Sequence, residues 1–151
     1  MANRAALAAF LALLALAGCS DDTPHVVVSG GGIIFNYRIA EATAGIVAEV
    51  ARTLPEGGAV EASFENPAGG DPIVETKTVT GDRRRYSFVT PPLHGIKADT
   101  DYVVVVRVLD AAGNEVERVE TSIHSDVDQS VLPKAPLTVG PGYARNPAAI
   151  E

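Results

Sequence analysis

The side chains best suited to acid–base chemistry near neutral pH are three histidines, His25, His94 and His124. None of them has a second metal-type ligand at helical or hairpin spacing, whereas a catalytic zinc ion needs three protein ligands. His94 stands in a predicted turn, where we expect a solvated ring. The sequence therefore predicts no metal site and no cofactor.

One short stretch holds the groups of a nucleophilic hydrolase. Ser122, His124, Ser125 and Asp126 supply hydroxyl, imidazole and carboxylate close together in sequence. Such triads are defined by geometry, and the stretch lacks the Gly-x-Ser-x-Gly turn that exposes a nucleophilic serine in many hydrolases. We therefore expect no catalytic residue and no enzyme. The hydrolase alternative stays open, and it requires His124 beside a buried carboxylate and an exposed hydroxyl.

Two charged clusters remain as candidates for binding. Asp126 and Asp128 carry oxygen ligands for calcium, but an EF-type loop needs many more, so we expect a solvated strand end. The basic run Arg83, Arg84 and Arg85 is the one local excess of positive charge in an acidic protein. It is either an interaction patch for an acidic partner or phosphate, or a solvated loop whose charges discourage strand addition at a sheet edge. We favour the solvated loop and keep the patch as the candidate interaction surface.

The first eighteen residues have the three parts of an export signal. A free amine and Arg4 come first, and the 14 residues from Ala5 to Gly18 carry no charged or polar side chain. That is short of the ~20 apolar residues that a membrane-spanning helix needs. Ser20 and Asp21 then restore polarity at once. The pattern predicts a cleaved signal peptide over residues 1–18 rather than a transmembrane anchor.

The leader ends in Leu16-Ala17-Gly18-Cys19, which resembles the lipobox of bacterial lipoproteins. The resemblance implies cleavage between Gly18 and Cys19 and a diacylglycerol on the Cys19 thiol, with palmitate-type acyl chains as the anchor. An ordinary secretory signal is the alternative, because Ala15-Leu16-Ala17 fits an A-x-A-like cleavage site. Cys19 is the only cysteine, so lipidation also removes a free thiol from an oxidising compartment.

The residue after the cysteine carries the sorting signal in many lipoproteins of Gram-negative bacteria. Aspartate there favours the inner membrane, whereas this chain has Ser20. The resemblance thus implies a lipid anchor in the cell envelope. It favours the outer membrane, facing the periplasm, over the inner membrane. Removing residues 1–18 takes away Arg4 and no acid, which leaves 11 basic and 19 acidic residues and a charge of −8. This charge argues against nucleic acid as a partner and against attraction to anionic headgroups.

The chain after Cys19 divides into a tether, a domain and a tail. Residues 19–32 are predicted to form a flexible tether, because Ser20 to Pro24 is polar and Ser29-Gly30-Gly31-Gly32 is flexible. Val26-Val27-Val28 between them allows a short strand. Short apolar runs separated by turn residues then predict about seven strands and an immunoglobulin-like β-sandwich over residues 33–125. The predicted strands are 33–39, 45–54, 59–65, 73–80, 85–90, 101–109 and 115–123. Residues 126–151 are expected to form a proline-rich C-terminal tail, extended over 129–151, in which Leu137 to Val139 allows a short strand.

Two of these segments carry more detailed predictions. Residues 101–109 contain the run 103–106 of four valines, which is apolar on both faces, so the strand is expected at the centre of a sheet. A hairpin at 110–114 is expected to join it to 115–123. Residues 40–51 are rich in alanine and glutamate and allow a partial helix, although Gly45 and the β-branched residues favour a strand.

Residues 93–104 resemble the E–F region of fibronectin type III domains. Ile96 matches that family's apolar residue before a polar turn, and Tyr102 matches the tyrosine that opens strand F. The resemblance implies a "tyrosine corner", in which the Tyr102 hydroxyl bonds to backbone a few residues upstream and pins the crossover between the sheets. Val104 stands where immunoglobulin domains have a cysteine, and the chain departs from the type III pattern in having no tryptophan.

These features predict a non-catalytic, lipid-anchored cell-envelope protein. Type III domains serve as spacers, adhesion surfaces and binding platforms, so the family implies little about activity. We expect the sandwich to contact another envelope protein of unknown identity, or to hold that protein at a distance from the membrane. The alternative is a periplasmic module that binds a small ligand or glycan. That alternative requires a concave aromatic or polar pocket, for which four tyrosines, four phenylalanines and no tryptophan offer few residues.

Overall fold

The computed structural model describes residues 23–150. The predicted signal peptide, the cleavage site between Gly18 and Cys19 and the lipidated thiol lie outside the described residues. Within residues 23–150, no helix is long and apolar enough to cross a membrane.

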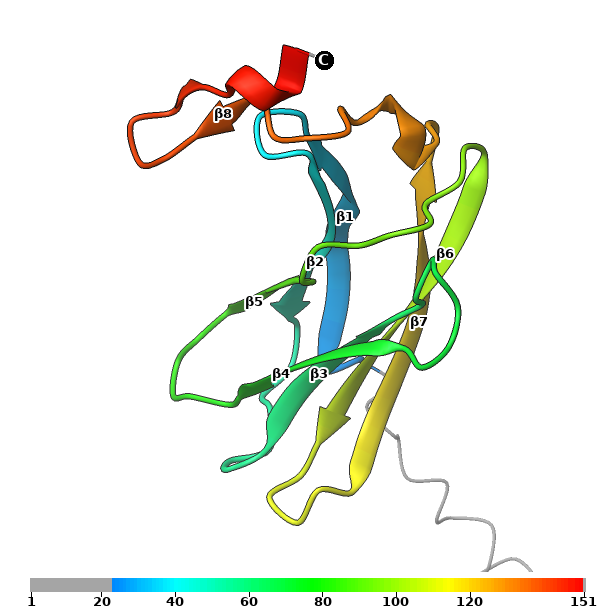
Figure 1. Cartoon of the computed structure of the whole chain (residues 1–151). Helices are drawn as coiled ribbons and strands as arrows, with labels where there is room; N and C mark the ends of the chain where they lie inside the picture. The colour runs from blue at the N-terminus through cyan, green and yellow to red at the C-terminus, as the bar shows by residue number, and fades with distance from the viewer. Residues whose placement is uncertain (1–22, 151) are drawn as a thin grey trace, which may run out of the picture.

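Seven strands form two antiparallel sheets that pack face to face (Figure 1). The three-stranded sheet has the order β1-β2-β5, and the four-stranded sheet has the order β4-β3-β6-β7. The bounds are β1 Val26–Asn36, β2 Glu41–Val50, β3 Ala59–Phe64, β4 Ile73–Thr78, β5 Arg85–Val89, β6 Thr100–Leu109 and β7 Glu115–Ser125. The predicted all-β sandwich of about seven strands is confirmed.

The core lies between the sheets and follows from the period-two patterns of the strands. In β3, Val60, Ala62 and Phe64 are buried, and in β5, Tyr86 and Phe88 are buried. Full burial of one such apolar side chain contributes about 1.5–3 kcal/mol to stability. The alternation of apolar and polar residues along these two strands accounts for both buried faces.

The centre of the larger sheet is β6, which pairs with β3 on one side and β7 on the other. Its position is the one predicted for residues 101–109. The hairpin to β7 is also confirmed, since Asp110 N donates to Asn114 O at 2.9 Å. The Asp110 carboxylate accepts from the Ala112 and Asn114 amides, and Gly113 takes the positive φ of 84° that the turn requires.

The ambiguous segment 40–51 forms a strand and not a helix. In β2, Ala42, Ala44, Ile46 and Ala48 are buried while their neighbours are more exposed. The strand ends at Val50, four residues before the predicted end. Three of its four buried positions carry alanine, which is a strong helix former, so the composition of this segment was also compatible with a helix.

Residues 26–32 of the predicted tether form the first part of β1. The short strand allowed at Val26–Val28 is thus present, and the prediction of flexibility is wrong for residues 29–32. They pair with β2, with a bulge between Val28 and Gly30. A Cβ at Gly31 would lie 2.8 Å from Ile46 Cγ2 and 3.2 Å from Ile123 Cγ2. Gly31 therefore permits close packing between the sheets rather than flexibility.

The start of β1 is tied to the opposite sheet by one carboxylate. Glu117 on β7 accepts from the His25 amide at 2.5 Å and from the Val26 amide at 3.1 Å. These amides stand at the end of the ladder with β2, where Val26 faces Val50. A backbone donor without a partner is costly when shielded from water, so Glu117 stabilises the point where the chain enters the domain.

The prediction of an extended tail over 129–151 is wrong for the parts that form secondary structure beside the sandwich, whereas the short strand allowed at 137–139 is present as β8 (Thr138–Val139). Asp128 caps a 3-10 helix, η1 (Gln129–Val131). The Gln129 side chain donates to Leu93 O at 2.6 Å and accepts from Ile96 N at 3.2 Å. One side chain amide thereby satisfies two backbone groups of the crossover between β5 and β6, a contact that composition cannot reveal.

The rest of the tail makes a short hairpin and a final helical turn. Its elements are β8 (Thr138–Val139), β9 (Ala144–Arg145) and the 3-10 helix η2 (Pro147–Ile150). The hairpin lies beside the β1–β2 turn, at the end of the sandwich opposite the start of β1 (Figure 1). Thr138 N donates to Arg38 O at 3.1 Å, and the Arg38 guanidinium lies 4.0 Å from the centre of the Tyr143 ring.

Candidate functional site

Tyr102 occupies the crossover between the two sheets. Tyr102 is 5% exposed, and its hydroxyl accepts from the Lys97 amide at 2.7 Å. Ile96, which is fully buried, packs in the same crossover. This hydrogen bond is the contact that the tyrosine-corner resemblance implies. Tyr102 thus holds the chain as it passes from β5 to β6, which is a structural role.

His124 lies on β7 between two carboxylates. Its Nδ1 is 2.9 Å from Asp101 Oδ1, and its Nε2 is 3.6 Å from Asp126 Oδ1. Both aspartates are exposed, and the buried Ser125 hydroxyl donates to Val127 O instead of approaching the imidazole. The hydrolase alternative requires a buried carboxylate and an exposed hydroxyl beside His124, and the described residues do not provide that arrangement.

The pKa of His124 is raised above 6.5, first by its hydrogen bond with Asp101 and then by the charges of Asp101, Asp126 and Asp99. The charged ring therefore contributes stability that is fully present below about pH 6.5, the unfolded value, and is lost as pH rises through the folded pKa. We expect an NMR titration of the ring protons to show a raised pKa that falls in Asp101→Asn. An unchanged His124 pKa in that variant would contradict the assignment.

The remaining candidate ligands do not converge. Across residues 23–150, no group of three or more histidine, cysteine, aspartate or glutamate side chains is placed to hold a metal ion. His25 Nδ1 lies 2.7 Å from Thr53 O, and His94 is exposed. Asp128 accepts from Ser130 N at 2.9 Å as the cap of η1 and lies 3.5 Å from Lys97 Nζ.

The basic run lies where the β4–β5 loop enters the edge strand β5, and its three side chains have three different environments. Arg85 Nη2 pairs with Glu49 Oε1 at 2.8 Å. The Arg83 guanidinium lies 5.4 Å from the centre of the Tyr86 ring. Arg84 accepts from Val50 N through its carbonyl, but its guanidinium has no hydrogen bond or ion pair within the described residues. Of the three charges, that of Arg84 is the most available to a partner.

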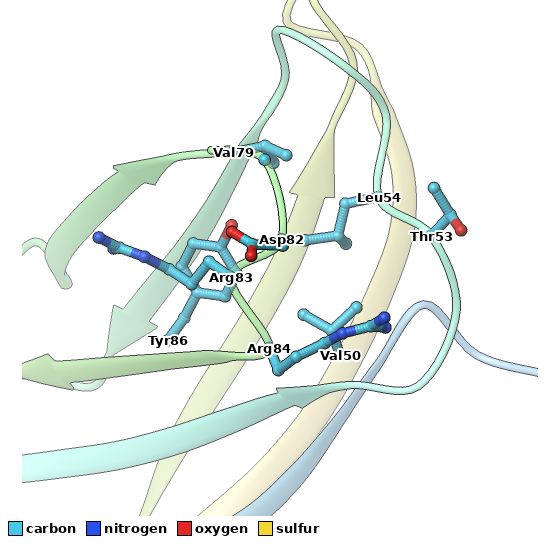
Figure 2. A pocket seen from close by; sticks show the side chains of 9 residues that line it. Val50, Thr53, Leu54, Val79, Asp82, Arg83, Arg84 and Tyr86 are labelled. Carbon is cyan, nitrogen blue, oxygen red and sulfur yellow. The ribbon is translucent and has the colours of Figure 1, made fainter.

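A cavity of about 140 Å³, which we call the Tyr86 cavity, lies between this loop and the end of β2 (Figure 2). Its apolar lining comes from Val50, Leu54 and Val79 and from the Tyr86 ring. Val50 stands at the end of β2, opposite Val26. The cavity therefore opens at the end of the sandwich where β1 starts.

The polar lining of the Tyr86 cavity includes Arg83, Arg84 and Asp82. Tyr86 is 1% exposed, yet its hydroxyl has no hydrogen-bond partner among residues 23–150. From sequence, the strand predicted over 85–90 carries Tyr86 on the same face as Phe88, which does not mark it as part of a cavity. The one sequence signal for a polar cavity at this place is that Tyr86, whose ring carries a hydroxyl, directly follows three arginines.

No family model matches the chain, and no curated protein matches it. Among solved structures, wild-type OgpA from Akkermansia muciniphila is similar at 14% identity, with a TM-score of 0.41, over 72% of this chain and 30% of that protein. A family 76 glycoside hydrolase from a bovine Bacteroides thetaiotaomicron strain is similar at 14% identity, with a TM-score of 0.38, over 65% of this chain and 20% of that one.

An endonuclease/exonuclease/phosphatase from Beutenbergia cavernae is also similar, at 13% identity and a TM-score of 0.33, over 66% of this chain and 35% of that protein. The chain thus spans about a third or less of the length of these solved proteins. Similarity at this level gives no basis for transferring an activity to this chain.

Proposed function

We propose that this chain is a non-catalytic, lipid-anchored cell-envelope protein whose β-sandwich contacts another envelope protein or spaces it from the membrane. The observation that carries the proposal is the short distance between the lipobox cysteine and the folded domain. Six residue steps separate Cys19 from His25, whose amide Glu117 already holds. That segment spans at most roughly 20 Å when fully extended.

On this proposal, one end of the sandwich stands close to the bilayer and the other projects away from it. The start of β1 is the membrane-proximal end, and it carries the basic run and the Tyr86 cavity. The β8–β9 hairpin is at the distal end (Figure 1). Ser20 supports the outer membrane, facing the periplasm, as the location.

The anchor has a direct test. Cys19→Ala is expected to release the protein from the membrane fraction and to abolish incorporation of labelled palmitate, because the acyl chains provide the membrane affinity. Ser20→Ala, which leaves the cysteine in place, serves as the matched control and should keep both. Membrane association of Cys19→Ala that equals the unsubstituted protein, without label, would contradict the proposal.

The partner surface has a second test. We infer that Arg83, Arg84 and Arg85 face an acidic region of the partner, since Arg84 is unpaired in the described part of the chain and the basic run lies at a sheet edge. Crosslinking in cells should capture a partner with the unsubstituted protein. Arg84→Glu should lower the yield about tenfold, because a like-charge contact replaces an attraction.

The matched control for this substitution is Lys134→Glu, which makes the same charge change at an exposed tail residue. It should leave the crosslinked yield unchanged. If both variants lose the partner equally, the effect follows net charge and not the basic run, and the proposed surface is wrong.

A further inference from the structure

The outward face of the three-stranded sheet is uncharged over its middle rows. Residues of a strand alternate between the two faces of a sheet, and the inward positions of β2 and β5 are the buried ones. Gly45 and Val47 of β2 therefore point outward, as do Ser87 and Val89 of β5. None of the described residues that line the hollow on this face is charged.

The charged residues of this face stand at its two ends. At one end Glu49 and Arg85 neutralise each other in an ion pair of 2.8 Å, and at the other end Glu41 begins β2. The outward face of the four-stranded sheet is different, because Arg107 and Arg118 form ion pairs with acidic side chains on it. The two faces thus offer a partner different surfaces, one mostly apolar and one charged.

The middle of the outward face has a floor without side chains. Gly32 of β1 lies opposite Gly45 of β2, and Gly30 lies opposite Val47. A Cβ at Gly30 or Gly32 would have no neighbour within 4 Å in residues 23–150, and neither glycine has a positive φ. Glycine weakens a strand, so no packing or backbone requirement of the described domain accounts for these two residues. Glycine inside a strand often marks a place where another backbone approaches closely.

Large apolar side chains border this glycine floor. Ile34 is 64% exposed and Val89 is 58% exposed. Ile34 follows Gly32 by two positions along β1, and Val89 lies opposite Gly45 across the sheet, so the two side chains border the floor on two sides. Removal of such exposed apolar surface from water favours association.

The charge of the chain narrows the choice of partner. Two copies with a formal charge of −7 each repel one another, and the repulsion is smallest where the facing surfaces carry no charge. A second copy also supplies a matching shape, because its exposed Ile34 and Val89 can enter a floor that lacks side chains. A strongly charged partner would find no group of opposite sign among the described residues that line the hollow.

We propose that the outward face of the β1-β2-β5 sheet docks against the same face of a second copy in an isologous dimer. Ile34 and Val89 of each copy pack on the glycine floor of the other, and the ion pair of Glu49 and Arg85 lies at the rim. The proposal needs neither the lipid anchor nor the basic run, so it goes beyond the proposed function.

The test is photo-crosslinking in cells that produce two full-length copies of the chain with different epitope tags. One copy carries the photoreactive residue benzoylphenylalanine in place of Ser87, beside the glycine floor, and we expect a crosslinked product that contains both tags. The same residue in place of Ser122, an exposed serine of β7, is the matched control and should give at least about tenfold less of that product. A product without the second tag, no product, or equal yields from the two positions overturns the proposal.

Two substitutions on this face test the packing. Gly32→Val fills the floor at a position with open space around it, and Ile34→Glu places a charge against the second copy, so each should lower the yield of the two-tag product about tenfold. Val74→Glu, which places the same charge on an exposed residue of β4, should leave the yield unchanged. Urea unfolding followed by circular dichroism checks that each variant is folded. A yield that survives both Gly32→Val and Ile34→Glu overturns the dimer, and since both variants keep Cys19, a lost product does not reflect a lost anchor.

Discussion

Gly31→Ala is expected to destabilise the domain by about 1–3 kcal/mol, as overpacking of a tight site does. A Cβ at this position would lie 2.8 Å from Ile46 Cγ2, 3.0 Å from Gly45 O and 3.2 Å from Ile123 Cγ2. Two of these atoms belong to β2 and one to β7, so relief requires movement of both sheets. Urea unfolding followed by circular dichroism measures the change.

The neighbouring glycines supply the matched controls for Gly31→Ala. A Cβ at Gly30 or Gly32 would have no neighbour within 4 Å, and neither residue has a positive φ. Alanine there should be neutral or should stabilise by up to about 1 kcal/mol, because it restricts the unfolded chain. Equal effects at all three positions would show that the run is a flexible linker and that the described packing of β1 is wrong.

Tyr102→Phe is the second large expected effect, with a loss of about 1–2 kcal/mol. The substitution keeps the buried ring and removes only the hydroxyl that accepts from the Lys97 amide. The amide is then left without that acceptor in a part-buried crossover. Because the crossover joins the sheets, both thermal and urea unfolding should report the loss.

Two other tyrosines are controls for removal of the same atom. Tyr143 is 59% exposed, so Tyr143→Phe should change stability by less than about 0.5 kcal/mol. Tyr86→Phe removes a buried hydroxyl that has no partner in the described part of the chain, and it should not destabilise the domain. A similar loss in all three variants would show that the Tyr102–Lys97 hydrogen bond contributes nothing specific.

The Tyr86 cavity and the proposed anchor lie at the same end of the molecule. Val50 pairs with Val26 in β1 and donates to Arg84 O in the loop before β5. These contacts place the basic run within two strands of the point where the chain enters the domain. A ligand or partner bound there would thus sit between the sandwich and the membrane, if Cys19 carries lipid as we propose.

In β5 and the loop before it, the sequence pattern shows which face a side chain lies on but not which distant residues surround it. Alternation places Tyr86 and Phe88 on one face of a strand, and both are buried. The same alternation says nothing about the Tyr86 cavity, whose lining comes from β2, the segment after it and the β4–β5 loop. Likewise, the sequence marks Arg85 only as part of the basic run, and it does not show the ion pair with Glu49, which is 36 residues away.

The sequence alone determined the features that depend on near neighbours along the chain. These are the strands and their buried faces, the hairpin at 110–114, the tyrosine that opens β6, and an N-terminal pattern whose consequences remain to be tested. Period-two burial and turn chemistry are local, so they can be read without knowing what packs against them. The tertiary structure decided whatever depends on residues far apart. Gly31 is a site of close packing because the side chains of Ile46 and Ile123 approach it. The start of the C-terminal segment is held in place because the Gln129 side chain binds the backbone of the β5–β6 crossover. Arg84 and Tyr86 line one cavity because the end of β2 meets the β4–β5 loop at that point.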